Sequence, residues 1–319
     1  MQGLSAVFRK ELQDHFSSFR FAILFALIAM VSFITSYMAA MHMRENLEGL
    51  SSNQFPFLML FSTPGALFSM VQFVAFFGPL IGLVLGFDAI NRERSQGTLI
   101  KLVSQPIYRD AVINGKFLAG VATISIMLVA IVLVISGFGL AIVGIVPSLE
   151  EIWRLIIYLG ISIFYVAFWL GISILFSILL RSIATSALTT VALWIFLSFF
   201  VSLGAEALAN SVAPVDTKKD VQPEVVLKNA RVKEVVSLFS PMVLYSDATG
   251  TIIDPMRKTT RSLVLMGPME QLLSTRFKNP LPLSQSLLVV FPYIMVLIGI
   301  TLFCFLISYL VFMLQEIRT

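Results

Sequence analysis

Charged side chains gather in one short stretch of this chain, residues 87–116. Charged residues make up only 13% of the whole sequence. The stretch places acids and bases side by side: Asp88, Arg92, Glu93, Arg94, Lys101, Arg109, Asp110 and Lys116. Long apolar runs lie on either side of it, and a charge at the centre of a bilayer costs at least about 2.5 kcal/mol. The stretch is therefore predicted to be a loop in water between two membrane spans.

The first half of this loop predicts a helix end followed by a sharp turn. Glu93 and Arg94 lie at the end of one helical stretch. Gly97 supplies the backbone freedom that a sharp turn needs, because it has no Cβ. Thr98 is of the residue type that caps the start of a new helix. We therefore expect a second, short helix from Thr98 to about Val103.

The second half of the loop ends that short helix and returns the chain to the membrane. Leu99 belongs to its apolar face, and Pro106 prevents it from continuing. Arg109 and Lys116 are expected at the membrane surface. A short amphipathic helix across the ends of two long spans is suited to transmit motion. An ordinary positively charged loop with an interfacial helix explains the same pattern equally well.

Other reactive residue types are scarce. The sequence has one cysteine, Cys304, and two histidines, His15 and His42, so neither an intrachain disulfide nor a Cys- or His-rich metal site is predicted. No paired carboxylates or Ser/Lys arrangement lies clearly within an apolar run. We predict no catalytic residues and no metal site, and an intramembrane enzyme is the least favoured class.

The composition requires a membrane protein, because 58% of the residues are hydrophobic against about 45–50% in soluble domains. Six runs have the roughly 20 apolar residues that a span needs: 21–43, 66–90, 115–146, 153–180, 183–207 and 285–314. Residues 1–20 predict an amphipathic interfacial helix, with Arg9, Lys10 and Glu11 on its polar side. The chain is thus divided into 1–20, spans one to five at 21–207, an insert at 208–284, and the sixth span with a short tail at 285–319.

The distribution of positive charge predicts the orientation. Most Lys and Arg residues of the short flanks fall on one side: Arg9, Lys10, Arg20, Arg92, Arg94, Lys101, Arg109, Lys116, Arg181 and Arg318. The short flanks of the other side carry Arg44 and Arg154. By the positive-inside rule both termini are expected in the cytoplasm of a multi-pass plasma-membrane protein. The insert 208–284 is then outside, as two or three short helices that cap the outer face or dip into the membrane, one of them at 263–277.

Several segments resemble a known family. Glu93-Arg94-Ser95-Gln96-Gly97-Thr98-Leu99, then Ser104-Gln105-Pro106-Ile107-Tyr108-Arg109 and Lys116, resemble the signature of the type-2 permease family of ATP-binding-cassette (ABC) transporters. Phe8-Arg9-Lys10-Glu11-Leu12 resembles that family's interfacial helix, and Ser240-Pro241 with Tyr245 and Asp254-Pro255 its outer region. The long insert at 208–284 departs from shorter members.

The resemblance implies an all-α integral membrane protein with six transmembrane helices, an interfacial helix, a cytoplasmic coupling helix and an outer helical insert. It implies a permease subunit, typically a homodimer in the bilayer, that binds two separate ATPase subunits and no nucleic acid. ATP and Mg would be bound by those ATPases, since this chain has no G-x-x-x-x-G-K-[ST] loop and no cofactor of its own.

In such a permease the coupling residues would be Glu93, Arg94, Gly97, Thr98, Leu99, Pro106 and Arg109. The expected function is ATP-driven export. The alternative is a membrane protein that uses ATPase-driven motion for signalling or for the assembly of another complex, without carrying a solute.

Overall fold

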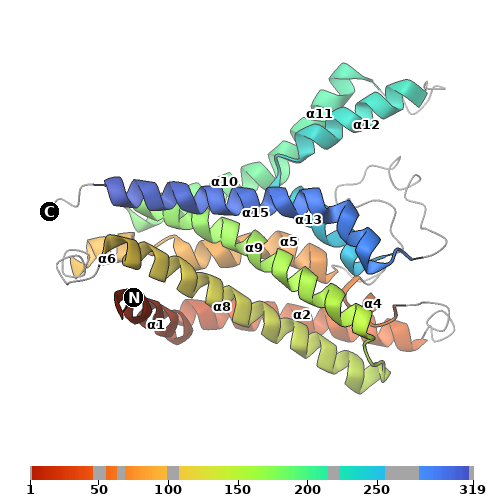
Figure 1. The fold of residues 1–319 in the computed structure, drawn as a ribbon, viewed down its shortest axis with the longest axis horizontal. Helices are drawn as coiled ribbons and strands as arrows, with labels where there is room; N and C mark the ends of the chain where they lie inside the picture. Colours follow the sequence, from red (N-terminus) through yellow and green to blue (C-terminus); the bar gives the residue numbers. More distant parts are fainter. Residues whose placement is uncertain are drawn as a thin grey trace.

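Six long apolar helical segments make up most of the structure and form a bundle from which the end of the fifth segment departs (Figure 1). The computed structural model of this protein describes residues 2–45, 55–62, 69–98, 108–214, 223–255 and 280–315. The six segments run Phe19–Met41, Met70–Ser95, Arg109–Val143, Leu149–Leu179, Ile183–Val212 and Leu283–Leu314. Each is long enough to cross a hydrocarbon core of about 30 Å. Within the described residues there is no strand, so the prediction of an all-α protein with six membrane spans is confirmed.

The helices that build these segments follow the chain in order. They are α2 (Phe19–Glu45), α5 (Met70–Gly86) with α6 (Asn91–Ser95), α8 (Arg109–Phe138) with the π-helix η1 (Gly139–Val143), α9 (Leu149–Leu179), α10 (Ile183–Ile195) with the π-helix η2 (Phe196–Phe200) and α11 (Val201–Val212), and α15 (Leu283–Leu314). The shorter helices are α1 (Gln2–Ser17), α4 (Met59–Ser62), α12 (Pro223–Ser237) and α13 (Pro241–Ile253).

The two ends of the bundle carry different elements. Helices α1 and α6 and the last turn of α15 lie together at one end, which we call the α6 end, whereas α4 lies at the other, the α4 end (Figure 1). Helix α8 begins at the α6 end with Arg109, six residues before the start of the predicted span. Tyr108 is extended, and Asp110 in the first turn favours a helix N-terminus. The loop predicted to end at 116 is therefore partly helical.

Helix α9 forms the centre of the bundle and packs closely against α5. Gly82 lies where the two backbones meet, because a Cβ there would be 2.7 Å from both the Leu170 nitrogen and the Val166 oxygen. Such close approach of small residues is a common way for membrane helices to pack. Helix α5 continues through Pro79, which leaves the carbonyl of Ala75 without its helical donor. The hydroxyl of Tyr165 on α9 donates to that carbonyl at 2.7 Å.

Helix α13 is buried along its whole length, between α9, α15 and α5. It begins with Pro241 after an extended Ser240, as a helix start should. Tyr245 stacks on Tyr165 with ring centroids 4.4 Å apart, and its hydroxyl lies 2.9 Å from Ser162 Oγ. The insert therefore contains a helix that packs within the bundle, in keeping with the expectation that some of its helices do more than cap the outer face. The expected helix at 263–277 lies outside the described residues.

Helices α11 and α12 form a hairpin that projects from the bundle (Figure 1). Asn229 joins them, donating to Asn210 Oδ1 at 3.0 Å and to the Ala213 carbonyl at 2.7 Å. Small buried residues, Ala205 and Ala209, let the two helices approach each other. Helix α12 is one of the short helices that were expected in the insert.

Candidate functional site

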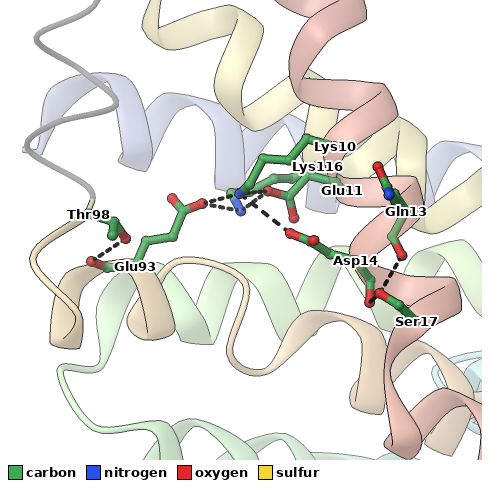
Figure 2. A network of polar contacts seen from close by, with 8 residues as sticks. All are labelled: Lys10, Glu11, Gln13, Asp14, Ser17, Glu93, Thr98 and Lys116. Carbon is green, nitrogen blue, oxygen red and sulfur yellow. Dashed lines mark hydrogen bonds and ion pairs between the residues drawn. The ribbon is translucent and has the colours of Figure 1, made fainter.

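The candidate site is a cluster of ion pairs at the α6 end, where α1, α6 and α8 meet (Figure 2). Lys116 Nζ on α8 lies 2.9 Å from Glu93 Oε1 on α6 and 2.8 Å from Glu11 Oε1 on α1. The side chains are only 4%, 9% and 11% exposed, respectively. The buried ammonium of Lys116 between two buried carboxylates holds three helices together. If the helices separated, some of these charges would lose their partners.

Lys10 completes this cluster from its rim. Its Nζ lies 3.0 Å from Glu11 Oε1, 3.4 Å from Glu93 Oε1 and 3.6 Å from Asp14 Oδ2, and its side chain is about half exposed. We call Lys10, Glu11, Asp14, Glu93 and Lys116 the ion cluster. It contains two ammonium groups and three carboxylates, so its formal charge is negative.

The neighbouring charges shift the pKa values of the two residues on α1. Burial disfavours the charged form of Glu11, but Lys116 and Lys10 outweigh burial and lower the pKa of its carboxyl. Burial likewise opposes the charge of Lys10, yet Glu11, Glu93 and Asp14 raise its pKa. Both groups are thus held in their charged forms by each other and by α6 and α8.

The chain turns sharply after α6. Gly97 has a φ of +66°, and a Cβ built on it would meet nothing within 4 Å. Glycine is therefore required there by the left-handed backbone conformation and not by crowding. Thr98 Oγ1 donates back to the carbonyl of Glu93 at 3.2 Å. The predicted turn at Gly97 is confirmed, whereas Thr98 is bonded to the helix before it. The remainder of the predicted short helix lies outside the described residues.

The last residue described after α15, Gln315, lies against this turn. It accepts from Arg94 Nη2 on its side-chain oxygen at 3.1 Å and from Arg109 Nη1 on its carbonyl at 3.3 Å. Its own amide donates to the Ile178 carbonyl at the end of α9 at 3.3 Å. Arg94 and Arg109 therefore connect the two sides of the loop to the ends of α9 and α15.

The corner between α5 and α6 is fixed to its neighbours as well. Ser177 Oγ on α9 accepts from the backbone nitrogens of Ile90 and Asn91 at 3.0 and 3.1 Å. Asp88 accepts from Arg20 Nη1 on α2 at 2.7 Å. A cavity of about 460 Å³ lies between this corner and α1, and the ion cluster forms part of its wall. Polar contacts thus join α6 and the corner before it to α1, α2, α8 and α9, and to Gln315 after α15.

Comparison with known proteins places the chain in a family. The family described as ABC-2 family transporter protein matches residues 5–317, nearly the whole chain. The chain belongs to the ABC-2 family of transporter proteins. With six helices long and apolar enough to cross a membrane, this ABC-2 protein is a multi-pass membrane protein.

Two curated proteins resemble part of this ABC-2 chain. One is named probable ABC transporter permease protein NosY, from Pseudomonas aeruginosa, and is 36% identical over 92 residues. The other carries the same name, comes from Stutzerimonas stutzeri and is 33% identical over 91 residues. Each match covers 28% of this chain and 31% of the relative. The likeness thus spans about a third of either relative's length.

Most of the predicted coupling residues lie together. Glu93, Arg94, Gly97, Thr98 and Arg109 lie together at the α6 end, as do the residues of the predicted interfacial helix, Arg9, Lys10 and Glu11. Arg9 is exposed, in keeping with the predicted polar side. Leu99 and Pro106 lie outside the described residues.

One expectation in this region is wrong. Glu11 is not on the exposed polar side of α1 but buried, because it follows Val7 by one turn on the same face. Lys116, which was expected at the membrane surface, has a side chain that is only 4% exposed within α8. Its charge is tolerated there because two carboxylates neutralise it.

A second buried ionic site, at the α4 end, was missed by the sequence analysis. Arg154 on α9 is fully buried and pairs with Glu150 Oε1 at 2.9 Å. It also donates to the carbonyls of Thr251, Ile252 and Leu281 and to Ser286 Oγ. Arg154 was predicted to be a positive residue of an outer flank, and it joins α9 to α13 and to the start of α15. The i, i+4 spacing of Glu150 and Arg154 was the available signal.

Proposed function

We propose that this protein is the permease subunit of an ABC transporter and that its ATPase partner binds at the α6 end. The observation that supports this most is the ion pair between Glu93 on α6 and Lys116 on α8. A force applied to α6 from outside the bundle reaches α8 through this pair and α1 through Glu11. Because the packed bundle resists gradual deformation, such a force favours one arrangement of spans over another.

The proposed complex contains two ATPase subunits, which bind ATP and Mg, and two copies of the permease. Support for a second copy comes from the faces of three spans. Only 22% of the apolar window of Phe19–Met41, 17% of Ile183–Val212 and 22% of Leu283–Leu314 is buried within the described residues. Their apolar faces are available to lipid and to another protein. The α6 end faces the cytoplasm in this arrangement, with both termini, because the positive charges of the short flanks gather there.

The proposed direction of transport is outward, and the substrate is apolar or amphipathic. The described parts of the six spans carry charged side chains near their ends and none in their middle turns. An ion pathway or a proton relay across the membrane needs such central charges. The resemblance to exporting members supports the direction.

A second candidate is a membrane protein that turns ATPase-driven motion into signalling or the assembly of another complex. The projecting α11–α12 hairpin favours it, because the hairpin offers exposed Leu227 and Val235 away from the bundle. Stimulation of the ATPase activity by a lipophilic compound would support transport. ATPase activity insensitive to every such compound, but changed by a protein bound at the hairpin, would support the second candidate.

The proposed partner can be tested by co-purification of the detergent-solubilised protein with its ABC ATPase. The variant Gly97→Pro should lose the ATPase, because proline fixes φ near −65° and cannot adopt the observed +66°. Gly97→Asn is the matched control, since asparagine tolerates the left-handed region and should retain most binding. If a folded wild-type protein captures no ATPase, the proposed function is wrong.

A further inference from the structure

Three arginines gather at the α6 end without a carboxylate partner. Arg94 on α6 and Arg109 at the start of α8 both donate to Gln315, at 3.1 and 3.3 Å. Arg181 follows α9, and its positive charge is close enough to that of Arg94 for the two to repel each other. We call Arg94, Arg109 and Arg181 the arginine patch. None of the three forms an ion pair with a residue that the structure describes.

Other basic residues at the same end differ from the patch, because carboxylates neutralise them. Lys10 and Lys116 pair with the carboxylates of the ion cluster, and Arg20 pairs with Asp88 at 2.7 Å. Asp110, which follows the patch residue of α8 in sequence, accepts from the backbone at the start of that helix at 2.8 Å and forms no ion pair with a described residue. Within the described part of the chain, no carboxylate therefore lies at ion-pair distance from the arginine patch.

Uncharged groups hold the patch in position. Gln315, which accepts from two of the arginines, is itself fixed by its bond to the Ile178 carbonyl near the end of α9, at 3.3 Å. Asn91 on α6 donates to the Ser182 carbonyl at 3.4 Å and so joins α6 to the turn that carries Arg181. The last carbonyls of α9 and α15 are the negative ends of their helix dipoles and favour cations nearby. These contacts place the three guanidinium groups close together but supply no full negative charge.

The guanidinium groups are also free to bind a ligand. Arg181 is exposed, and Arg94 and Arg109 are half-buried. A guanidinium has five N–H donors, whereas Arg94 and Arg109 each make one side-chain hydrogen bond to a described residue. A carboxylate is the group that a guanidinium binds best in a protein partner, through two parallel hydrogen bonds. The chemistry of the patch therefore fits an acidic surface.

We propose that the arginine patch binds acidic side chains of the ATPase subunit. The inference rests on the proposed function and deepens it, because it names the chemistry of one contact. Arg94 belongs to α6, the helix against which the ATPase is placed, and Arg109 and Arg181 extend the same patch to the start of α8 and the end of α9. Carboxylates of the ATPase neutralise like charges that otherwise repel each other. Through Gln315 the contact also reaches the end of α15.

The first test measures the Kd of the purified ABC ATPase for the permease in phosphatidylcholine nanodiscs, in which the lipid has no net charge. Arg181→Glu reverses one charge of the patch and should raise Kd by about tenfold or more, because like charges then face each other across the interface. Arg9→Glu is the matched control. Arg9 is exposed on α1 at the same end and lies outside the patch, so Kd should stay within about twofold of wild type. Thermal melting of each permease alone checks that it remains folded.

The salt dependence of binding gives a readout that a change in fold would not mimic. Arg181→Gln removes one charge without reversing it, and the side chain of Arg181 forms no ion pair with a described residue. This variant should raise Kd by about fivefold at low salt. Between about 50 and 300 mM salt, Kd should then rise less for Arg181→Gln than for wild type, because one charge pair fewer is screened. Arg9→Gln should show the salt dependence of wild type.

The outcomes separate the inference from the function on which it rests. If wild type binds no ATPase, both are wrong. If wild type binds and Arg181→Glu binds equally well, or Arg9→Glu weakens binding to the same extent, the ATPase partner stands and the acidic contact at the patch is wrong. Nanodiscs that contain phosphatidylglycerol provide a third arm. An effect of Arg181→Glu that appears only in those nanodiscs would mean that the patch holds a lipid phosphate, which would overturn the proposal.

Discussion

The ammonium of Lys116 and the carboxylate of Glu93 lie 2.9 Å apart inside the protein, on α8 and α6. The two residues are not neighbours in sequence, and neither side chain is more than 9% exposed. Separation of the two helices would therefore leave charges unpaired in a poorly solvated place. This contact makes the short helix after the second span and the start of the third span move together.

Loss of Lys116 is expected to destabilise the protein severely. Lys116→Met leaves Glu11 and Glu93 buried with only the half-exposed Lys10 between them. Removal of one partner from a buried ion pair costs about 3–5 kcal/mol. Lys10→Met is the control and should cost about 1 kcal/mol or less, because Lys116 remains. Chemical unfolding in detergent would measure both, and equal losses would contradict the central position given to Lys116.

Acidification is expected to lower stability in two steps. Burial lowers the pKa of His15 below 6.5, and this effect exceeds that of the nearby carboxylates. The folded state then binds a proton more weakly than the unfolded chain, so stability falls as pH drops below about 6.5. The lowered pKa of Glu11 adds stability that is fully present above 4.5 and is lost as pH falls through its folded value.

Thermal midpoints measured between about pH 7.5 and 5 would show the first step. His15→Gln should flatten this part of the curve, since glutamine does not titrate. A curve for His15→Gln that runs parallel to that of wild type would assign the loss to another group.

Tyr165 and Pro79 are expected to be energetically coupled. Tyr165 Oη donates to the Ala75 carbonyl that Pro79 leaves without a helical donor. Tyr165→Phe should cost about 1–1.5 kcal/mol in the wild-type protein. The same change should cost less in a Pro79→Ala background, where residue 79 supplies an N–H to that carbonyl. A double-mutant cycle by chemical unfolding measures the difference, and identical costs in both backgrounds would show that the bond does not replace the missing donor.

Arg154 and Arg44 are expected to differ sharply, although their sequence contexts predicted the same outer flank for both. Arg154 is fully buried with five oxygen acceptors from α9, α13 and the start of α15, whereas Arg44 is exposed. Arg154→Ala should cost about 3–5 kcal/mol and Arg44→Ala about 0.5 kcal/mol or less. Arg154→Lys should fall between, because an ammonium has three donors. Protease protection of α13 would report the release of that helix.

The six spans and the turn at Gly97 were predictable because both follow from local sequence. An apolar run of sufficient length has few alternatives to a membrane helix. Gly97 has the positive φ that glycine adopts at little cost. The ion cluster was not predictable from local sequence. Glu11 and Lys116 are far apart in the chain. A charged residue near the end of an apolar run gives the same sequence pattern whether its side chain faces water or a buried partner. Only the spacing of Val7 and Glu11 indicated the buried face.

Burial of α13 was hidden by its composition. Ser246, Thr249 and Thr251 suggest a polar surface segment, yet all three are buried. Thr249 Oγ1 donates to the carbonyl of Tyr245 one turn earlier at 2.7 Å, so its hydroxyl needs no water. Small hydroxyl residues that bond within their own helix permit close packing in membrane proteins. The composition of this segment therefore does not distinguish a helix that caps the surface from one that packs within the bundle.

The most direct test of the central claim is where on this protein the ATPase lies. A photoreactive amino acid at exposed Ser95, on α6, and another at exposed Leu227, on α12, would be compared in the assembled complex. We expect a crosslink to the ATPase from position 95 and none from position 227. Capture of the ATPase from position 227, with none from position 95, would contradict coupling through α6 and the orientation on which it depends.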